Sequence, residues 1–430
     1  MREIDATLAR REALSWYSLP RAVFSGGNDV ELLRGGDALF PAMHRAIAQA
    51  TRDIWLATYI FHDDEAALGL ADALVAAAAR GVRVRVVIDG FGSGQSLATV
   101  HARLSKGGVA VAVFRPVQGW WSWLLPGQLR RLHQKLCVVD GREAFVGGIN
   151  LIDDRLDLHH GWQATPRLDY AVRLLGAVVR PVEQTARAMW TRAWLGRDWR
   201  DEIAALARRP HRLLRARKLL RRLRTSKWAE LPAGSADSNP VRVAFVVRDN
   251  LRQRRTIERS YVDAIHAARE SVDIVCPYFY PGHAFRRALR EAARRGVRVR
   301  LLLQGRWDYR MAELAAHALY EELLGRGVYI HEYQPAYLHA KVAVVDADWA
   351  TVGSSNIDPL SLLVNLEANV VVRDRAFTAD LRAEIEAALA DARRITAADG
   401  ESGRFGLLRR ALVAWCARVY LRVAGASGQY

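Results

Sequence analysis

The sequence LHQKLCVVD at residues 132–140 returns as LHAKVAVVD at residues 338–346, with His, Lys and Asp in the same register. Each copy is followed at the same distance by a glycine turn that ends in Asn, GGIN at 147–150 and GSSN at 353–356. A motif that recurs together with its flanking turn indicates an internal duplication, in which each copy is one structural unit. This duplication decides the predicted architecture.

The segments around each motif also repeat, in the order strand, helix, strand. The predicted elements are 53–61, 66–80 and 81–88 in the first half, and 272–280, 284–295 and 296–303 in the second. Strands that alternate with helices of this length are typical of β-α-β units, whose sheets carry helices on both faces. We therefore predict an α/β fold of two similar lobes, each a mainly parallel sheet flanked by helices. A pseudo-twofold axis would relate the lobes, with one site between them.

Composition sets the domain boundaries. We expect the N-terminal lobe at residues 1–202 and the C-terminal lobe at 241–396. Residues 203–240 begin as a basic amphipathic segment and end in a linker rich in Pro, Gly and Ser. Residues 397–430 are predicted to form an amphipathic helix on a membrane surface, because their arginines are too costly for a lone spanning helix. Core packing is the alternative for this helix, and a solvated face or an RNA contact is the alternative for the basic segment.

The charge of the chain indicates an anionic partner. The 63 Lys and Arg residues outnumber the 46 Asp and Glu residues, which gives a formal net charge of +17. Such a charge favours nucleic acid or acidic lipid. The three cysteines lie far apart, without a disulfide framework or a metal-binding spacing, so a reducing compartment is expected. Residues 1–20 lack the apolar core of a signal peptide, so no export is expected.

The paired His and Lys residues are candidates for chemistry. Residues two apart in a strand project to the same face, so His133 and Lys135 share one space, as do His339 and Lys341. A single pair of this kind would usually be surface decoration, but the duplication argues against that interpretation. Of the 63 basic residues only five are Lys, and two of these occupy the motif. A position that is not Arg in such a chain indicates that a compact ammonium group is required.

Two imidazoles that face each other across a cleft suit attack on a phosphodiester. One imidazole can attack phosphorus and form a covalent phosphohistidine, while the other protonates the leaving alkoxide. The lysines and the turn residues Asn150 and Asn356 would stabilise charge on the nonbridging oxygens. Asp140 and Asp346 have the opposite strand parity and are expected to order the turns that follow them. No metal-binding motif accompanies these residues, so no metal or other cofactor is expected.

The two complete motifs resemble the signature of the phospholipase D superfamily, with Gly148 where many members carry Ser. The likeness covers roughly residues 28–372, and segments such as YIF at 59–61 and DGFGS at 89–93 are similar to bacterial cardiolipin synthases, most of all to the shorter B-type. The resemblance implies phosphatidyl transfer between two phosphatidylglycerol molecules, giving cardiolipin and glycerol. It also implies a peripheral protein on the cytoplasmic side of the bacterial inner membrane.

The resemblance also implies individual roles. His133 would be the nucleophile, and His339 would act first as an acid and then as a base. Lys135, Lys341, Asn150 and Asn356 match the phosphate-holding positions, while Asp140 and Asp346 complete the catalytic motif. Superfamily members use acidic residues to orient each histidine, and Asp169 and Glu367 are the candidates for that role. Either acid could instead be an ordinary residue at a strand edge.

A tryptophan-rich loop favours lipid over nucleic acid. Gly81 and His133 are 52 residues apart in the first half, whereas Gly296 and His339 are 43 apart in the second. The longer interval contains the loop 118–131, with five expected membrane-contacting residues, Trp120, Trp121, Trp123, Leu124 and Leu125. Core packing or stacking on bases is the alternative for these side chains. Two further functions remain open: a hydrolase or nuclease of the same superfamily, and an inactive membrane-binding protein.

Overall fold

The computed structural model describes residues 17, 20–116, 130–207, 241–249, 253–306, 319–358, 361–362 and 365–396, with the backbone alone for 195–207. Three predicted segments lie wholly or mostly outside these residues. They are the tryptophan-rich loop with all five of its expected membrane contacts, the basic segment and linker beyond residue 207, and the C-terminal helix at 397–430.

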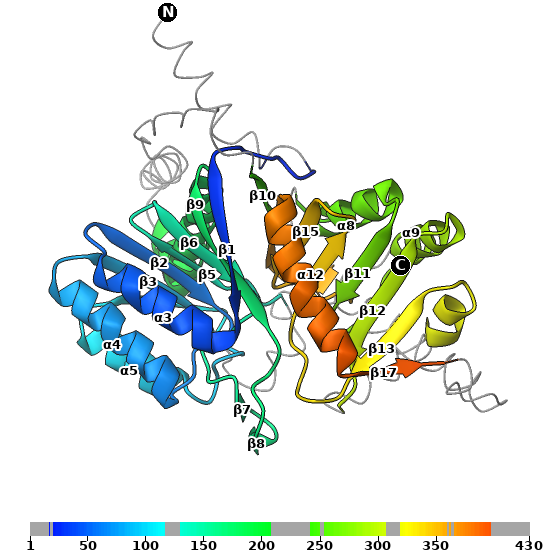
Figure 1. Cartoon of the computed structure of the whole chain (residues 1–430). Coiled ribbons are helices and arrows are strands. Elements are labelled where there is room, and N and C mark those ends of the chain that lie inside the picture. The colour runs from blue at the N-terminus through cyan, green and yellow to red at the C-terminus, as the bar shows by residue number, and fades with distance from the viewer. Residues whose placement is uncertain are drawn as a thin grey trace, which may run out of the picture.

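The first lobe is built on a seven-stranded sheet in the order β1-β9-β6-β5-β2-β3-β4. Its strands are β1 (Asn28–Arg34), β2 (Asp53–Thr58), β3 (Arg83–Asp89), β4 (Ala110–Phe114), β5 (Leu136–Val139), β6 (Glu143–Gly147) and β9 (Tyr170–Gly176). Helices α3 (Gly35–Ala48), α4 (Glu65–Ala79) and α5 (Leu97–Lys106) cover one face, and α6 (Val179–Ala207) packs on the other (Figure 1). A separate two-stranded ribbon, β7 (Leu156–Asp157) and β8 (Gly161–Trp162), projects from this lobe.

The second lobe repeats this plan with an eight-stranded sheet in the order β10-β16-β15-β14-β11-β12-β13-β17. Its strands are β10 (Arg242–Arg248), β11 (Ser271–Val275), β12 (Arg298–Gln304), β13 (Tyr329–Tyr333), β14 (Val342–Val345), β15 (Trp349–Gly353), β16 (Glu367–Arg373) and β17 (Ala392–Ile395). Its helices are α8 (Thr256–Ala267), α9 (His283–Arg294) and α12 (Arg375–Ala390). The first seven strands match the order of the first sheet, with β17 added at the edge, so the prediction of two similar α/β lobes is confirmed.

The predicted pairing was wrong in one respect, because the sheets are mixed and not mainly parallel. Among the described strands of the two sheets, β2-β3-β4 and β11-β12-β13 run parallel, and the remaining neighbours are antiparallel. The cause is local. The motif strands β5 and β14 return at once through tight turns into β6 and β15, where Asp140 and Asp346 adopt the left-handed region with φ of 52° and 47°. Such turns make hairpins, which are antiparallel.

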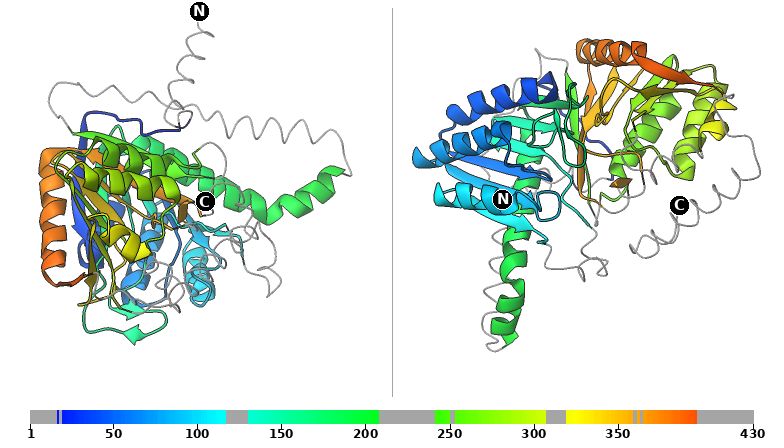
Figure 2. Two further views of the ribbon diagram at one scale, coloured as in Figure 1. Left: turned by 90° about the vertical axis from the view of Figure 1, so that its right-hand side faces the viewer. Right: turned by 90° about the horizontal axis from the view of Figure 1, so that it is seen from below.

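Three apolar clusters hold the molecule together. One lies under α3, α4 and α5, a second lies under α8 and α9, and the third lies between the lobes and contains residues of both sheets. Leu132 and Leu338, the residues before the two motif histidines, both belong to the shared cluster and are buried. Figure 2 shows the two sheets side by side, and the shared cluster contains residues of both. The apolar core therefore continues up to the point where the motifs meet.

The motif aspartates fasten each hairpin turn to the start of a parallel strand. The carboxylate of Asp140 accepts hydrogen bonds from the backbone N–H groups of Thr51, Arg52 and Asp53 at 2.9, 2.8 and 3.0 Å. Asp346 accepts in the same way from the backbone of residues 269–271. Burial raises the pKa of Asp140, but the hydrogen bonds outweigh it and hold the pKa below its ordinary value.

We expect Asp140→Ala to lower the free energy of unfolding by about 1–3 kcal/mol, because it leaves three backbone N–H groups without this acceptor, including that of the buried Asp53. Urea denaturation measures this change. Since the folded-state pKa is depressed, the contribution is present above the unfolded pKa of about 3.9 and is lost as the pH falls through the folded value. Asp348→Ala is the control, since Asp348 is half exposed and its ion pair with Arg373 lies on the surface; it should change stability by less than about 0.5 kcal/mol. Equal effects of the two variants would contradict this role for Asp140.

Candidate active site

Both histidines lie on the seam between the lobes, each directly after a backbone bridge. Leu132 of the first lobe pairs with Leu366 of the second, and Leu338 of the second pairs with Leu168 of the first. The backbone N–H of His133 donates to Leu366 O at 3.0 Å, and that of His339 donates to Leu168 O at 2.9 Å. Because each bridge ends beside both a histidine and an acid, four functional groups converge on one region.

Each histidine is bonded to an acid from the opposite lobe. Nδ1 of His133 lies 2.9 Å from Oε2 of Glu367, and Nδ1 of His339 lies 2.6 Å from Oδ2 of Asp169. A carboxylate only accepts, so Nδ1 carries the proton and Nε2 keeps its lone pair. The structure thus brings both acids expected to orient the histidines into contact with them. The crosswise pairing was not predicted, because only the fold brings residues of the two lobes together.

The glycine turns explain why the two acids differ in length. In the second lobe, Ser354 Oγ donates to Oε2 of Glu367 at 2.6 Å. In the first lobe the corresponding residue is Gly148, where a Cβ atom would lie 2.3 Å from Oδ1 of Asp169. The shorter acid therefore occupies space that only glycine leaves open. From the sequence, Gly148 meant only that a serine hydroxyl is absent. The structure shows that the residue in the turn and the acid change together, from Ser354 with Glu367 in the second lobe to Gly148 with Asp169 in the first.

The motif lysines are buried and bend back toward their own histidines. Lys135 is 6% exposed and Lys341 is 1% exposed. Nζ of Lys135 donates to His133 O at 2.8 Å, and Nζ of Lys341 donates to His339 O. Burial lowers the pKa of both lysines, to about 7 for Lys135, although Glu367 opposes the shift for Lys135 and Asp169 opposes it for Lys341. Holding these ammonium groups beside the histidines therefore costs desolvation free energy, which a bound anion would offset.

Tyr59 is a neighbour of the site that the sequence interpretation did not assign. Its ring lies 4.9 Å from the His133 ring, edge to face, and 5.4 Å from Nζ of Lys135. An aromatic face favours a nearby cation. In the sequence, residues 59–61 were noted only for their similarity to the family, and their spacing from the motif does not predict that Tyr59 lies beside His133.

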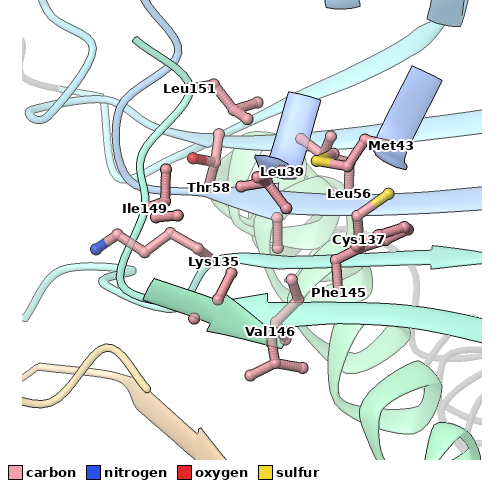
Figure 3. A pocket seen from close by; sticks show the side chains of 14 residues that line it. Leu39, Met43, Leu56, Thr58, Lys135, Cys137, Phe145, Val146, Ile149 and Leu151 are labelled. Atoms are coloured by element: carbon pink, nitrogen blue, oxygen red, sulfur yellow. The ribbon is translucent and has the colours of Figure 1, made fainter. Parts of the chain in front are cut away.

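The space behind Lys135 is packed with apolar side chains. A cavity of about 20 Å³, close to the size of one water molecule, lies between α3 and the sheet and is lined by residues such as Met43, Leu56 and Phe145. Figure 3 shows the ammonium group of Lys135 pointing away from Met43, Cys137 and Phe145. The apolar stem of Lys135 therefore fills the core while its charged end emerges at the strand end.

The turn asparagines are also buried, Asn150 at 4% and Asn356 at 8% exposure. Oδ1 of Asn150 has no hydrogen-bond partner among the described residues. Oδ1 of Asn356 lies 4.0 Å from Sγ of Cys276, a residue with no sequence signal for this site. Buried amides with spare hydrogen-bonding capacity are suited to a polar ligand.

The structure does not bring Asp140 and Asp346 to the histidines, although they were predicted as part of the catalytic motif. Each follows its strand at the end away from the histidine, and seven residues of extended chain span roughly 20 Å. Their carboxylates bind backbone N–H groups, as described above. They stabilise the fold, in keeping with their parity in the sequence.

The two His–acid pairs differ electrostatically. Burial lowers the pKa of His133, and the charge of Glu367 partly opposes this. The pKa of His339 falls well below its ordinary value, through burial and then the charges of Lys341 and Lys135. Burial raises the pKa of Asp169 to about 6, whereas hydrogen bonds and the charges around Glu367 overcome its burial and lower its pKa. These shifts favour the neutral form of both imidazoles, and Glu367 is more readily ionised than Asp169.

Among the described residues, no group of three or more His, Cys, Asp and Glu side chains is arranged to hold a metal ion. None of the helices in the described part of the chain is long and apolar enough to cross a bilayer.

Comparison with known proteins agrees with this geometry. The sequence model of the family described as "Cardiolipin synthase, PLD-like domain" matches residues 43–161 and 261–389, one segment in each lobe. The chain belongs to this family. Membership in this phospholipase D-type cardiolipin synthase family makes it an enzyme of the phosphatidyltransferase class.

Relatives match most of the chain. Cardiolipin synthase B of Escherichia coli (strain K12) is 37% identical over 364 residues, 85% of this chain and 81% of the relative. Cardiolipin synthase A of Pseudomonas putida (strain GB-1) is 31% identical over 402 residues, 92% of this chain and 77% of the relative. The crystal structure of a phosphatidylserine synthase from Haemophilus influenzae Rd KW20 superposes with a TM-score of 0.62 at 13% identity, covering 96% and 98% of the two chains. That likeness shows a shared fold.

We expect Gly148→Ala to reduce turnover about a hundredfold, because the added methyl group displaces Asp169 and with it His339. Ser354→Ala should cost about tenfold through the lost hydrogen bond to Glu367. Gly69→Ala is the control, since the nearest atom to its Cβ is 4.0 Å away, and it should keep full turnover. Initial rates of phosphatidyl transfer, with melting temperature as a check on folding, measure these effects. Wild-type turnover in Gly148→Ala would contradict the steric argument.

Proposed function

We propose that this chain is a cardiolipin synthase that transfers a phosphatidyl group from one phosphatidylglycerol to another through a phosphohistidine. The observation that carries the proposal is the pair of seam histidines, each with Nδ1 held by a carboxylate of the other lobe. Fixing both Nδ1 atoms leaves two Nε2 atoms for one substrate, which is what double displacement at phosphorus requires. The names of the relatives support cardiolipin as the product.

His133 is the proposed nucleophile. Its partner Glu367 is ionised and receives a second hydrogen bond from Ser354, so the acid is held in place and stabilises positive charge on the imidazole. Nε2 of His133 attacks phosphorus and the bond from phosphorus to the glycerol oxygen breaks. His339 supplies the proton to that oxygen, so glycerol leaves and phosphatidyl-His133 remains.

His339 then acts as a base. It takes the proton from a hydroxyl of a second phosphatidylglycerol, whose oxygen attacks phosphorus and releases His133, giving cardiolipin. The depressed pKa of His339 suits this step because the imidazole is neutral before it accepts the proton. For the first step, the negative charge of the bound phosphodiester raises the pKa of the same imidazole and allows it to hold a proton.

Four further residues are proposed to hold the phosphate group. Lys135, Lys341, Asn150 and Asn356 are all buried at the strand ends and turns beside the histidines. Their N–H groups would bind the nonbridging oxygens in a site with little water, where such contacts are strong. The proposed setting is the cytoplasmic surface of the bacterial inner membrane, with residues 118–131 as one membrane contact.

Covalent trapping tests this assignment. Acid-sensitive phosphatidyl-enzyme, quenched during turnover and mapped by peptide mass spectrometry, should carry the lipid on His133. His133→Ala should abolish cardiolipin formation, whereas His266→Ala, a change at a half-exposed histidine outside the site, should retain it. Cleavage of plasmid DNA with phosphatidylglycerol vesicles untouched would instead identify a nuclease, and free phosphatidic acid as the main product would identify a hydrolase.

The rate should depend on pH through Lys135. Its pKa of about 7 means that the ammonium group is lost as the pH rises, so kcat/KM should fall at least about tenfold per unit well above pH 7, with loss of the proton that His339 must donate adding to the decline. On the acid side, kcat/KM should fall only below pH 6.5, because the pKa of His133 is lowered. Initial rates with a short-chain phosphatidylglycerol across this range measure the profile. An alkaline limb near the ordinary lysine value of about 10.4 would contradict the role of a buried Lys135.

A further inference from the structure

The ribbon formed by β7 and β8 exposes more apolar surface than its size explains. Trp162 is 65% exposed and Leu158 is 39% exposed, and both belong to this hairpin. Among the described residues, only Phe91, Trp194 and Tyr329 are other large hydrophobic side chains with comparable exposure. Apolar side chains that gather on a projecting element mark a contact surface more often than singly exposed ones do.

The hairpin has a defined structure. Leu156 pairs with Trp162 and Asp157 pairs with Gly161, so Leu156 and Trp162 project from the same face of the ribbon. Asp157 closes the turn by accepting hydrogen bonds from the backbone N–H groups of His159 and His160, each at 2.9 Å. Gly161 takes a φ of 69°, which glycine adopts without strain. Leu158 and Trp162 are therefore presented on a constrained loop.

The turn of the hairpin is connected to the His339–Asp169 pair through His160. The His160 ring stacks on Tyr337 at 5.3 Å, and Tyr337 O accepts from the backbone N–H of Leu168 at 2.9 Å. Tyr337 lies two residues before His339, and Leu168 precedes Asp169. Figures 1 and 2 show the hairpin projecting beyond the rest of the described chain near the junction of the lobes. Whatever the hairpin contacts is thus brought to the edge of the active site.

Three arginines lie near the hairpin. Arg167 donates to Leu156 O, and the side chain of Arg155, which is 41% exposed, lies 3.8 Å from Asp37. Arg306 of the second lobe lies 5.8 Å from the Tyr337 ring. A hairpin that exposes Trp162 and Leu158 near Arg155, Arg167 and Arg306 matches the interface of an anionic bilayer, where indole groups lie at the headgroup level and cations meet lipid phosphates.

We propose that residues 155–163 dock on an anionic phospholipid bilayer by inserting Leu158 and Trp162 into its interface. Docking orients the seam so that the headgroups face His339 and His133. The proposal rests on the proposed function in one respect, since it takes a lipid surface as the source of substrate. It adds a second proposed membrane contact, formed by residues that the structure describes, to the one predicted for the loop at 118–131.

The test compares Leu158→Ser/Trp162→Ser with the control Tyr329→Ser. Tyr329 is 40% exposed and begins β13, at the end of that strand away from Tyr333 and the motif that follows it. In flotation with vesicles of phosphatidylglycerol and phosphatidylcholine, the double variant should bind about tenfold more weakly and the control should bind as wild type. Turnover should fall by a similar factor on vesicles but stay unchanged on short-chain phosphatidylglycerol below its critical micelle concentration.

Two results would overturn the proposal. One is wild-type vesicle binding and vesicle turnover in the double variant. The other is unchanged vesicle binding with a lower oligomeric state by analytical ultracentrifugation, which would make the hairpin a contact between copies of the chain. Failure of the proposed function looks different: wild type would then form no cardiolipin from either form of phosphatidylglycerol, while flotation would still report on the hairpin.

Discussion

The site depends on two short backbone bridges across the seam between the lobes. Each bridge fixes the residue before a histidine against the residue before the acid that serves it, Leu132 with Leu366 and Leu338 with Leu168. The bridges are buried in the shared apolar cluster, where an unpaired N–H or C=O group would be costly. Because both lobes contribute to both bridges, neither lobe contains a complete His–acid pair by itself. Separation of the lobes would dismantle both pairs at once.

The side chains that support these bridges differ between the lobes. The backbone N–H of Leu132 donates to Oδ2 of Asp89 at 2.9 Å, and that of Leu338 donates to Oε1 of Gln304 at 2.8 Å. Asp89 and Gln304 end the equivalent strands β3 and β12. Asp89 is fully buried, and its pKa is raised by burial to about 6 although the charge of Arg131 opposes the shift. The duplication thus preserved the hydrogen bond while the two copies diverged in charge.

The same divergence separates the two His–acid pairs. Two lysines and two acids are buried within one small region, where burial shifts the pKa of Lys135, Lys341 and Asp169 toward the neutral form while Glu367 stays ionised. A bound phosphodiester adds negative charge that favours the protonated lysines and histidines, so substrate binding and protonation of the site are coupled. The Ser–Glu pair keeps an ionised acid at His133, whereas burial and the charges of Lys341 and Lys135 leave His339 weakly basic beside the Gly–Asp pair. Equivalent positions in the two lobes are thereby suited to different steps.

The sequence by itself determined the duplication, the α/β class, and the histidines, lysines and asparagines of the motifs, since these follow from spacing, strand parity and the family likeness. It offered the two acids only as candidates. Strand parity also separated Asp140 and Asp346 from the reacting groups. The mixed strand directions, the crosswise pairing of each histidine with the other lobe's acid, and the steric reason for Gly148 were decided by the tertiary structure. The physical reason is that the spacing of residues in the sequence predicts only which side chains are neighbours along the same strand. Contacts across the seam join residues as far apart as His133 and Glu367, and only the packing of two complete lobes specifies them.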